Sequence, residues 1–499
     1  MNTFMNELVN ENNFTRTENG ALSHKTSKSG LMDMFALGAA FRRRSDDDCI
    51  LLFKNAFEED KTLALRCLFY QGDIRGGQGE RRFFRVCYRW LANNYPEIAK
   101  KNLELIPEFK RWDDLIYVAI DTPVCGSMLD IIKHQLALDV DCKTPSLLAK
   151  WLPSENASSR ETKRVAEIIR NYLGMTHKEY RKMLSVLRGR INVLEKLMSS
   201  NQWEKIEFDK IPSKAGLIYR NAFARRDIIA KKYETFAKDK TTKVNADTLY
   251  PYEIVGEALK YCSHNYWGHN CKVTADETQR AMLDKYWENQ KDVLKGKPFN
   301  AICVVDTSGS MCGSEKMAPI NVAIGLGMYC AERAGGPFKD HYISFSSRPQ
   351  LIKIEGVDFL DKVNRIYQTN LCEDTNLEAT FRMLKNIALK ADPKDIPEQV
   401  IIISDMEVNY MSCEGWNEKQ FATGMETIRK DWERSGLKFP KVVYWNVEAR
   451  QNNFLDLGPN VSYVSGASPT FFEMLLTGKT GWDLMIETIC ADRYQAVKA

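Results

Sequence analysis

The sequence lacks several features that would place it in familiar protein classes. None of its apolar runs approaches the roughly 20 consecutive residues that a membrane-spanning helix needs. The first residues, Met1 to Glu7, contain neither a basic nor an apolar segment, so we expect no secretory signal peptide. The sequence has no Walker-type phosphate loop, no serine nucleophile elbow and no protein-kinase motif set. These absences argue against a membrane protein, a secreted protein and the best-known motif-bearing enzymes.

Cysteines are scattered through the chain without a paired spacing. The 13 cysteines are odd in number, which predicts reduced thiols in a cytoplasmic protein rather than a disulfide framework. The stretch from Cys262 to Cys271 also contains His264 and His269, and so offers four ligands for a soft metal. Its Cys-x-His pairs are tighter than the spacing of an ordinary zinc finger. A zinc site and a helix end with incidental Cys and His therefore both stay open.

The positive charge is unevenly distributed. The net charge of the whole chain is +4 at pH 7, with 70 Lys and Arg against 66 Asp and Glu. Residues 1–297 carry a net +9, residues 298–499 a net −5, and residues 158–243 alone a net +11. Such asymmetry is typical of a protein that presents a polyanion-binding surface on one part only. A solvated helix surface would give the same count.

The order of sequence patterns predicts an α-helical part followed by an α/β part. Residues 1–30 are polar and predict a poorly ordered arm that can become ordered against the body. Residues 31–290 read as amphipathic helices with short breaks and no strand pattern, which indicates a HEAT-like helical repeat. Residues 291–299 form a linker rich in Lys, Gly and Pro. In residues 300–499 strands alternate with helices, which predicts a Rossmann-like parallel sheet covered on both faces.

Two places in the helical part concentrate basic side chains. Three glycines in four residues, flanked by arginines, would let the backbone approach a phosphate that the arginines bind. A flexible turn between helices explains the glycines equally well. A helix further along has its apolar stripe on one face and basic residues on the other. The candidate phosphate-binding residues, which become RNA-binding candidates under the resemblance described below, are Arg75, Arg81 and Arg82 at the glycine loop, and Arg181, Lys182, Arg188 and Arg190 on the helix.

The stretch Ile302-Cys-Val-Val-Asp306-Thr-Ser308-Gly-Ser310 is the most informative in the chain. An apolar run ends abruptly in an acid, and two serines follow at alternate positions. A buried parallel strand reads as such a run, and ligands gather at the carboxyl ends of such strands. Asp306, Ser308 and Ser310 would therefore present three oxygens at one sheet edge. Oxygen ligands suit a hard cation, so the sequence predicts a site for Mg2+ or Mn2+.

Two later stretches complete the predicted metal site. Thr375 lies just before a helical pattern, and Asp405 ends a second apolar strand, with Glu407 close behind. The series Asp-x-Ser-x-Ser, a loop Thr and a strand-end Asp resembles the metal-ion-dependent adhesion site of von Willebrand factor type A domains. An ordinary strand-to-helix turn with serine caps is the alternative. The sequence departs from such domains at Glu373 and Asp374, where small residues are usual, and extra carboxylates there could alter metal preference or shield the site.

The whole chain from about residue 15 resembles a known architecture. A helical region followed by a type A domain is similar to the Ro autoantigen family, and several stretches look closer to a related helical-plus-type-A family of plants, fungi and phages. Those stretches are Asn19-Gly-Ala21, Arg75-Gly-Gly-Gln-Gly-Glu-Arg81, Lys150-Trp-Leu-Pro153, Leu187-Arg188 with Val193-Leu-Glu195, and Leu249-Tyr-Pro251. Ro-type proteins form a ring of helical repeats that binds misfolded RNA ends in its hole and structured small RNAs on its outer surface. The resemblance implies RNA binding on the basic helical part here.

Three classes of function are compatible with these patterns. The first is a non-enzymatic RNA-binding scaffold with a metal-dependent docking site. The second is a protein-interaction module alone, in which the metal takes a carboxylate from an acidic partner protein. The third is a Mg2+-dependent hydrolase, which we disfavour because hydroxyl ligands hold a metal without supplying a general base, and Glu407 is the one obvious candidate.

Overall fold

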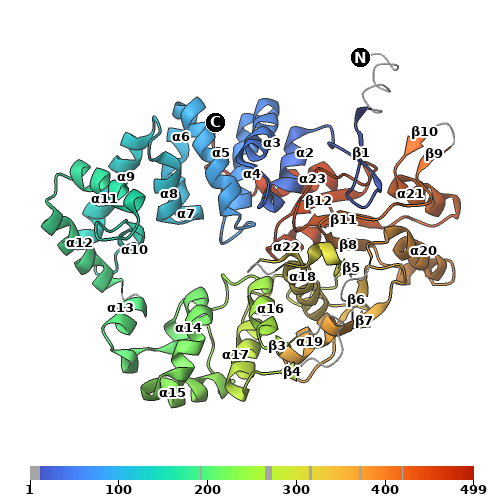
Figure 1. The fold of residues 1–499 in the computed structure, drawn as a ribbon. Coiled ribbons are helices and arrows are strands. Elements are labelled where there is room, and N and C mark those ends of the chain that lie inside the picture. The colour runs from blue at the N-terminus through green and yellow to red at the C-terminus, as the bar shows by residue number, and fades with distance from the viewer. Residues whose placement is uncertain (1–11, 192–193, 264–271, 314–316, 370–373, 418–419) are drawn as a thin grey trace.

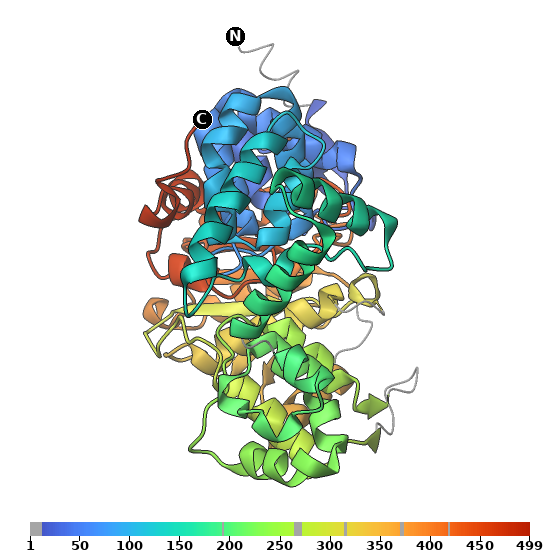
Figure 2. The same ribbon diagram turned by 90° about the vertical axis from the view of Figure 1, so that its left-hand side faces the viewer.

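A computed structural model shows a helix-rich arc joined to an α/β unit. It describes residues 12–191, 194–263, 272–313, 317–369, 374–417 and 420–499. In Figure 1 the arc leaves the α/β unit at its blue end, sweeps through the cyan and green helices, and returns at its yellow-green end. Figure 2 looks onto the middle of this arc, where the helices follow one another from top to bottom. A helix-rich N-terminal region and a C-terminal sheet are what the sequence predicts.

A six-stranded sheet forms the centre of the α/β unit. Its strands run in the order β12-β11-β8-β5-β6-β7. Their bounds are β5 (Ala301–Val305), β6 (His341–Ser344), β7 (Leu351–Lys353), β8 (Gln399–Ser404), β11 (Lys441–Asn446) and β12 (Val461–Ser465). Every residue of β5 and β8 is buried, as expected for strands covered on both faces.

The sheet is mixed, whereas the sequence predicts a purely parallel one. All neighbouring pairs are parallel except β6 and β7, which pair antiparallel. The connection between these two strands spans only residues 345–350. A parallel neighbour needs a crossover of a dozen or more residues, so the short connection makes a hairpin and places β7 at the edge.

Helices cover the sheet, and α18 fits most closely against it. This helix packs on β5, β6 and β8, and nearly all of its residues are buried. At Gly327 an added Cβ would lie 2.5 Å from Cγ2 of Val305, so the glycine permits this close packing. The helices of the unit are α18 (Pro319–Arg333), α19 (Phe359–Thr369), α20 (Leu377–Ala388), α21 (Gly424–Arg434), α22 (Phe471–Leu475) and α23 (Gly481–Ile489).

The arc consists of successive helices, each with an apolar face. In α12, for example, Tyr180, Leu184 and Leu187 are buried, and Thr176 with Glu179 forms a capping box at its start. The helices of the arc are α2 (Gly30–Leu37), α3 (Asp46–Glu59), α4 (Lys61–Gly72), α5 (Arg81–Asn94), α6 (Pro96–Asn102), α7 (Ile106–Phe109), α8 (Trp112–Ala119), α9 (Cys125–Asp141), α10 (Leu148–Trp151), α11 (Arg160–Tyr172), α12 (His177–Arg190), α13 (Leu194–Ser199), α14 (Ser213–Arg225), α15 (Asp227–Lys238), α16 (Pro251–Leu259) and α17 (Glu277–Glu288).

Both ends of the arc pack against the α/β unit. At the first end, α2 contacts β11, β12 and α23, and α4 contacts α23. At the second end, α16 packs on α18 and α19, and α17 packs on α19 (Figure 1). The buried apolar residues of the two parts form one continuous cluster that runs from Ala21 to Val497. The arc therefore starts and ends on the same unit and shares its core.

Three short antiparallel hairpins have no counterpart in the sequence prediction. One is formed by β1 (Phe14–Arg16) and β2 (Leu22–His24), in the segment predicted as a polar arm. The others are β3 (Cys262–Ser263) with β4 (Lys272–Val273), and β9 (Gly415–Asn417) with β10 (Gln420–Ala422). Strands of two or three residues are too short to show the alternation by which a strand is recognised.

Candidate functional site

The predicted metal-site residues of the first motif gather where β5 ends. Asp306 and Ser308 are buried. The Ser308 N–H donates to Oδ1 of Asp306 at 2.9 Å, and Ser404 donates its hydroxyl to Oδ2 at 2.5 Å. The hydroxyls of Ser308 and Ser310 lie 3.0 Å apart. The turn after the strand thus brings three of the predicted oxygen ligands together.

Asp405 reaches the same edge from the neighbouring strand. The pairing of Val305 with Ile403 places the ends of β5 and β8 side by side. Oδ1 of Asp405 accepts the Glu407 N–H at 3.1 Å. Its Oδ2 is buried and has no hydrogen-bond partner among the described residues. A guanidinium nitrogen of Arg450, from the loop after β11, lies 3.7 Å from that oxygen. An orphaned buried carboxylate oxygen is costly unless a cation binds it.

Thr375 joins this edge through the segment that follows β8. Its side chain is buried, and Oγ1 lies 3.1 Å from both the Glu407 carbonyl and Oδ1 of Asn409, to either of which it can donate. The preceding Asp374 accepts hydrogen bonds from Ser347 and from Asn409. Its carboxylate is therefore used to hold the loop. Glu373 lies outside the described residues.

The electrostatics of this edge favour a bound cation. Burial raises the pKa of Asp306 to about 7, and the charge of Asp405 adds to the rise. Burial also raises the pKa of Asp405 itself, against the opposing Glu407 N–H and Arg450. Glu407, fully buried, has its pKa raised to about 7 by burial as well. A divalent cation would stabilise the ionised carboxylates and reverse these shifts.

The N-terminal segment crosses this edge, which the sequence did not reveal. We call residues 17–21, between β1 and β2, the strap. The Thr17 hydroxyl donates to the Val408 carbonyl at 2.7 Å, and the Glu18 N–H donates to Oε2 of Glu407 at 2.6 Å. Asn19 donates its amide to the Glu407 carbonyl at 2.6 Å. The one sequence signal for the strap is the stretch Asn19-Gly-Ala21, which carries part of the family resemblance.

The arginines of the glycine loop are engaged within the protein. Arg81 contacts Asp113 and Asp114, each at 2.8 Å, and the Asp114 side chain is fully buried. Arg82 pairs with Asp46, and Arg75 donates to a backbone carbonyl. These three predicted residues are neighbours in the sequence, and in the structure each of them has a partner within the protein.

The glycine loop itself joins three parts of the molecule. A Cβ at Gly77 would lie 1.8 Å from the Tyr70 carbonyl oxygen, and one at Gly79 would lie 2.0 Å from the Tyr250 hydroxyl near the arc's far end. Gln78 accepts the N–H of Ser468 in the α/β unit at 3.1 Å. The glycines are therefore required by close packing at this junction, whereas the sequence suggested a phosphate-binding loop or a flexible turn.

The four candidates on α12 divide into two pairs. Arg188 donates to the carbonyls of Ala149 and Leu152, both at 2.8 Å, and Arg190 also donates to a backbone carbonyl. Arg181 and Lys182 are exposed, and Arg181 donates only to the carbonyl one turn earlier. Arg181 and Lys182 form no hydrogen bond to another described helix or strand, so they can bind a ligand without breaking such a bond.

Other predicted features resolve as follows. The Cys and His stretch falls largely on residues 264–271, which lie outside the described residues. Within the described ranges, no three His, Cys, Asp or Glu side chains gather as metal ligands. Of the helices that the structure describes, none has the length and apolar character needed to cross a membrane.

Comparisons with known proteins place the chain in a family. Residues 17–115 and 144–297 match the family described as domain of unknown function DUF2828, and residues 300–494 match domain of unknown function DUF7788. An uncharacterized protein of Acanthamoeba polyphaga mimivirus is 29% identical over 491 residues, covering 90% of this chain and 81% of that protein.

A solved structure shares the fold. The crystal structure of the Deinococcus radiodurans Ro (RSR) protein matches with a TM-score of 0.50 and 13% identity, over 93% of this chain and 99% of that one. The helix-rich region and the C-terminal mixed sheet thus form a Ro-like fold, as the sequence resemblance implied. The expected plant, fungal and phage relatives stay a prediction. Because its DUF2828 match spans half of its residues, the chain belongs to the DUF2828 family.

Proposed function

We propose that this protein is a non-enzymatic RNA-binding scaffold. The middle of the arc, helices α11 to α15, supplies the RNA surface. The edge formed by Asp306, Ser308, Ser310, Thr375 and Asp405 is a type A metal site for Mg2+ or Mn2+ that serves for docking. A Ro-like fold agrees with this proposal. The main observation behind it is the net positive charge of residues 158–243 on the arc.

The supporting observation is a set of exposed basic side chains without counter-charges. Residues 158–243 carry a net +11. Many of their Lys and Arg side chains are exposed and form no ion pair with a described residue. These are Arg160, Lys163, Lys178, Arg181, Lys182, Lys196, Lys205, Arg225, Arg226, Lys231, Lys240 and Lys243. Unpaired surface cations are what a phosphate backbone neutralises, and counterion release then supplies much of the affinity.

A charge reversal on α12 tests the RNA surface. Arg181→Glu with Lys182→Glu should weaken the binding of a structured small RNA and make its salt dependence shallower, by roughly 0.7 in the log–log slope for each phosphate that is no longer neutralised. Fluorescence anisotropy across a salt series measures both, and the melting temperature should not change. The control pair is Lys390→Glu with Lys438→Glu, exposed in the α/β unit.

Equal reductions of affinity in the two pairs would mean a non-specific charge effect rather than a surface on the arc. Unchanged affinity in both would favour the alternative, a module that docks an acidic protein at the metal site without RNA.

The metal site is supported by Oδ2 of Asp405, which is buried, has no hydrogen-bond partner among the described residues and faces the guanidinium of Arg450 at 3.7 Å. The donors at this edge are hydroxyl and carboxylate oxygens, the ligand type that Mg2+ prefers. Ser308, Ser310 and Thr375 would hold the cation, with Asp306 and Asp405 directly or through water. When bound, the cation would supply a Lewis-acidic position that accepts an oxygen from a partner. Asp306→Ala should abolish Mn2+ binding in calorimetry, whereas Asp374→Asn, in the loop before Thr375, should not. Unchanged affinity in the first variant would reject the site.

Binding rather than hydrolysis is favoured by the state of Glu407. Its Oε1 accepts the Asn453 amide at 2.9 Å and its Oε2 accepts the Glu18 N–H at 2.6 Å. Burial raises the pKa of Glu407 to about 7, but both of its oxygens are engaged by donors within the protein, which leaves it poorly placed to activate a water. The candidate base for a hydrolase is thus used to anchor the strap.

A further inference from the structure

The two edges of the central sheet differ in what covers them. At the β12 edge, α2 packs on the strand, and the Ser465 hydroxyl donates to the Phe35 carbonyl and accepts the Ala39 N–H. At the other edge, β7 packs extensively on β6 alone among the described helices and strands. Figure 1 shows β7 at the margin of the α/β unit. An uncovered edge presents unpaired backbone groups to which a further strand can bind.

The pairing with β6 determines which backbone groups of β7 face outward. The Ile354 N–H donates to the Asp340 carbonyl at 2.8 Å, so the ladder continues one residue beyond β7. Bonded and non-bonded residues alternate in an antiparallel pair, so Leu351 and Lys353 direct their N–H and C=O away from β6. These outward groups form no hydrogen bond with a described residue. They are the groups that another extended segment would pair with.

The side chains along this edge carry both charge signs and both parts of an apolar contact. Lys353 and Glu355 form an exposed ion pair at 2.8 Å. Leu351 is 60% exposed and, with Ile387 of α20, lines an apolar hollow of about 230 Å3. A cavity of roughly 150 Å3 already holds a benzene molecule. Val357, just before α19, is 88% exposed, the most of any large hydrophobic side chain among the described residues.

These side chains select one way of pairing two copies of the edge. Three antiparallel registers centred on β7 place outward residues opposite each other about a two-fold axis. If Lys353 lies opposite Lys353 of the second copy, like charges meet, which is destabilising. If it lies opposite Leu351, the pairing extends toward Pro349, which has no N–H to donate. If it lies opposite Glu355, opposite charges meet twice.

We propose that two copies of this chain associate edge to edge through β7, antiparallel about a two-fold axis at Ile354. Each Lys353 then faces Glu355 of the second copy, and the four side chains form a square of alternating charge. The same register brings Val357 of each copy to Leu351 of the other, at the rim of the apolar hollow. Such a contact is isologous, because each residue meets in the second copy the residue that meets it in return.

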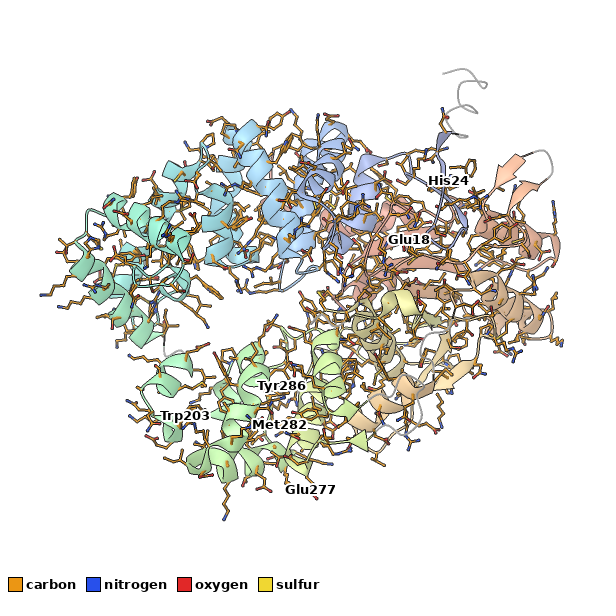
Figure 3. The ribbon with its side chains drawn as sticks, viewed as in Figure 1. Glu18, His24, Trp203, Glu277, Met282 and Tyr286 are labelled. Carbon is orange, nitrogen blue, oxygen red and sulfur yellow. The ribbon has the colours of Figure 1, made fainter. Side chains whose placement is uncertain are left out.

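Pairing at β7 leaves the other surfaces of the molecule uncovered. In Figure 3, Trp203 marks the middle of the arc on the left, away from the α/β unit that carries β7, and Glu18 marks the strap above that strand. The dimer would therefore present two arcs. Where these bind RNA, which rests on the function proposed above, an RNA with two sites would be held by both at a higher effective concentration. Association itself requires neither RNA nor metal.

Sedimentation velocity of the full chain, freed of nucleic acid by nuclease and high salt, tests the dimer. The range is roughly 1 to 100 µM, because a small interface binds weakly. The parent should form a dimer as concentration rises. Lys353→Glu places like charges opposite each other and should weaken association about 10-fold or more, and so should Glu355→Lys. The control Lys163→Glu, the same charge change at an exposed position of α11, should dimerise like the parent.

A mixture of the two single variants gives the sharpest result. In a mixed dimer of Lys353→Glu and Glu355→Lys chains, every charge faces an opposite charge, so the mixture should dimerise although each variant alone does not. Melting temperatures equal to the parent's would show that the variants are folded. A parent that stays monomeric over the whole range, or a Lys353→Glu variant that dimerises as strongly as the parent, overturns the proposal. Either result leaves RNA binding and the metal site untouched, since both are measured separately.

Discussion

Helices α2–α8 and helices α11–α15 are both rich in basic side chains but use them differently. In the first group, Arg81 and Arg85 converge on the fully buried Asp114, at 2.8 and 2.6 Å. In the second group, most basic side chains are exposed and face no described acid. The lesson is that a count of Lys and Arg does not identify a binding surface. The counter-charges, which come from distant parts of the chain, decide whether an arginine binds a ligand or the protein itself.

Position on the molecule explains the difference. The first group forms the junction with the α/β unit, where Asp73 is fully buried and accepts two hydrogen bonds from Arg493 and one from Tyr494. The second group lies at the middle of the arc, away from that unit (Figure 1). Burial at the junction demands paired charges, because an isolated buried charge is costly. The basic side chains in the middle of the arc are exposed to water and therefore need no partner of opposite charge.

The largest effect should follow from breaking the junction. Asp73→Ala leaves the partly exposed Arg493 and the buried Tyr494 hydroxyl without their carboxylate, and hydrogen bonds to a charged group are worth about 1.5–3 kcal/mol each. The control is Asp121→Asn, which removes the charge of an exposed pair with Arg164 on α11 while keeping a residue type that tolerates the positive φ at this position, and it should cost about 1 kcal/mol or less. Chemical denaturation measures both. Equal destabilisation by the two substitutions would show that the two groups do not differ as described.

A second test uses a buried lysine of the junction. Burial lowers the pKa of Lys110 to about 7, its Nζ lies 3.6 Å from the centre of the Phe84 ring, and it has no hydrogen-bond partner among the described residues. Between pH 7 and about 10 the unfolded chain holds the proton and the folded protein does not. Stability should therefore rise with pH over this window, by up to about 1.4 kcal/mol per pH unit.

Lys110→Met should remove this rise, because the substitution leaves no titrating group at this position, and should be more stable than the parent near pH 7. Denaturation at pH 7, 8 and 9 gives the comparison. A parallel pH dependence in the two proteins would contradict the assignment.

The smallest effects should separate two arginines of one helix. Arg188→Ala leaves the carbonyls of Ala149 and Leu152 without their donor and should cost about 1–3 kcal/mol. Arg181→Ala removes an exposed side chain and should change stability by no more than about 0.5 kcal/mol. Melting temperatures of the two variants suffice. A large destabilisation by Arg181→Ala would mean that the middle of the arc relies on its basic residues for folding.

The grouping of Asp306, Ser308, Ser310 and Asp405 at one sheet edge could be predicted because its information is local, whereas metal binding there stays a prediction. Asp306, Ser308 and Ser310 fall within five residues, and the apolar strands before Asp306 and Asp405 indicate where the acids lie. Sheet topology then brings the two strand ends together. The antiparallel direction of β7 was missed although the connection over residues 345–350 is too short for a parallel crossover.

The strap and the junction could not be predicted, because their contacts join distant residues. Glu18 meets Glu407 across 389 positions, and Arg450 meets Glu18 across 432. Gly77 and Gly79 indicated that another group approaches the backbone of the glycine loop closely. The sequence does not tell whether that group is a phosphate or another part of the protein. Only the position of Tyr70, Tyr250 and Ser468 distinguishes them.

The pairing of Asp73 with Arg493 also determines when the junction can fold during synthesis of the chain. The two residues are 420 positions apart. Ribosomes add roughly 5–20 residues per second, so the first helices wait roughly 20–80 s for their final partner. During that interval the face around the glycine loop is incomplete and its apolar surface is open to chaperones. The first helices synthesised are thus among the last to reach their native packing.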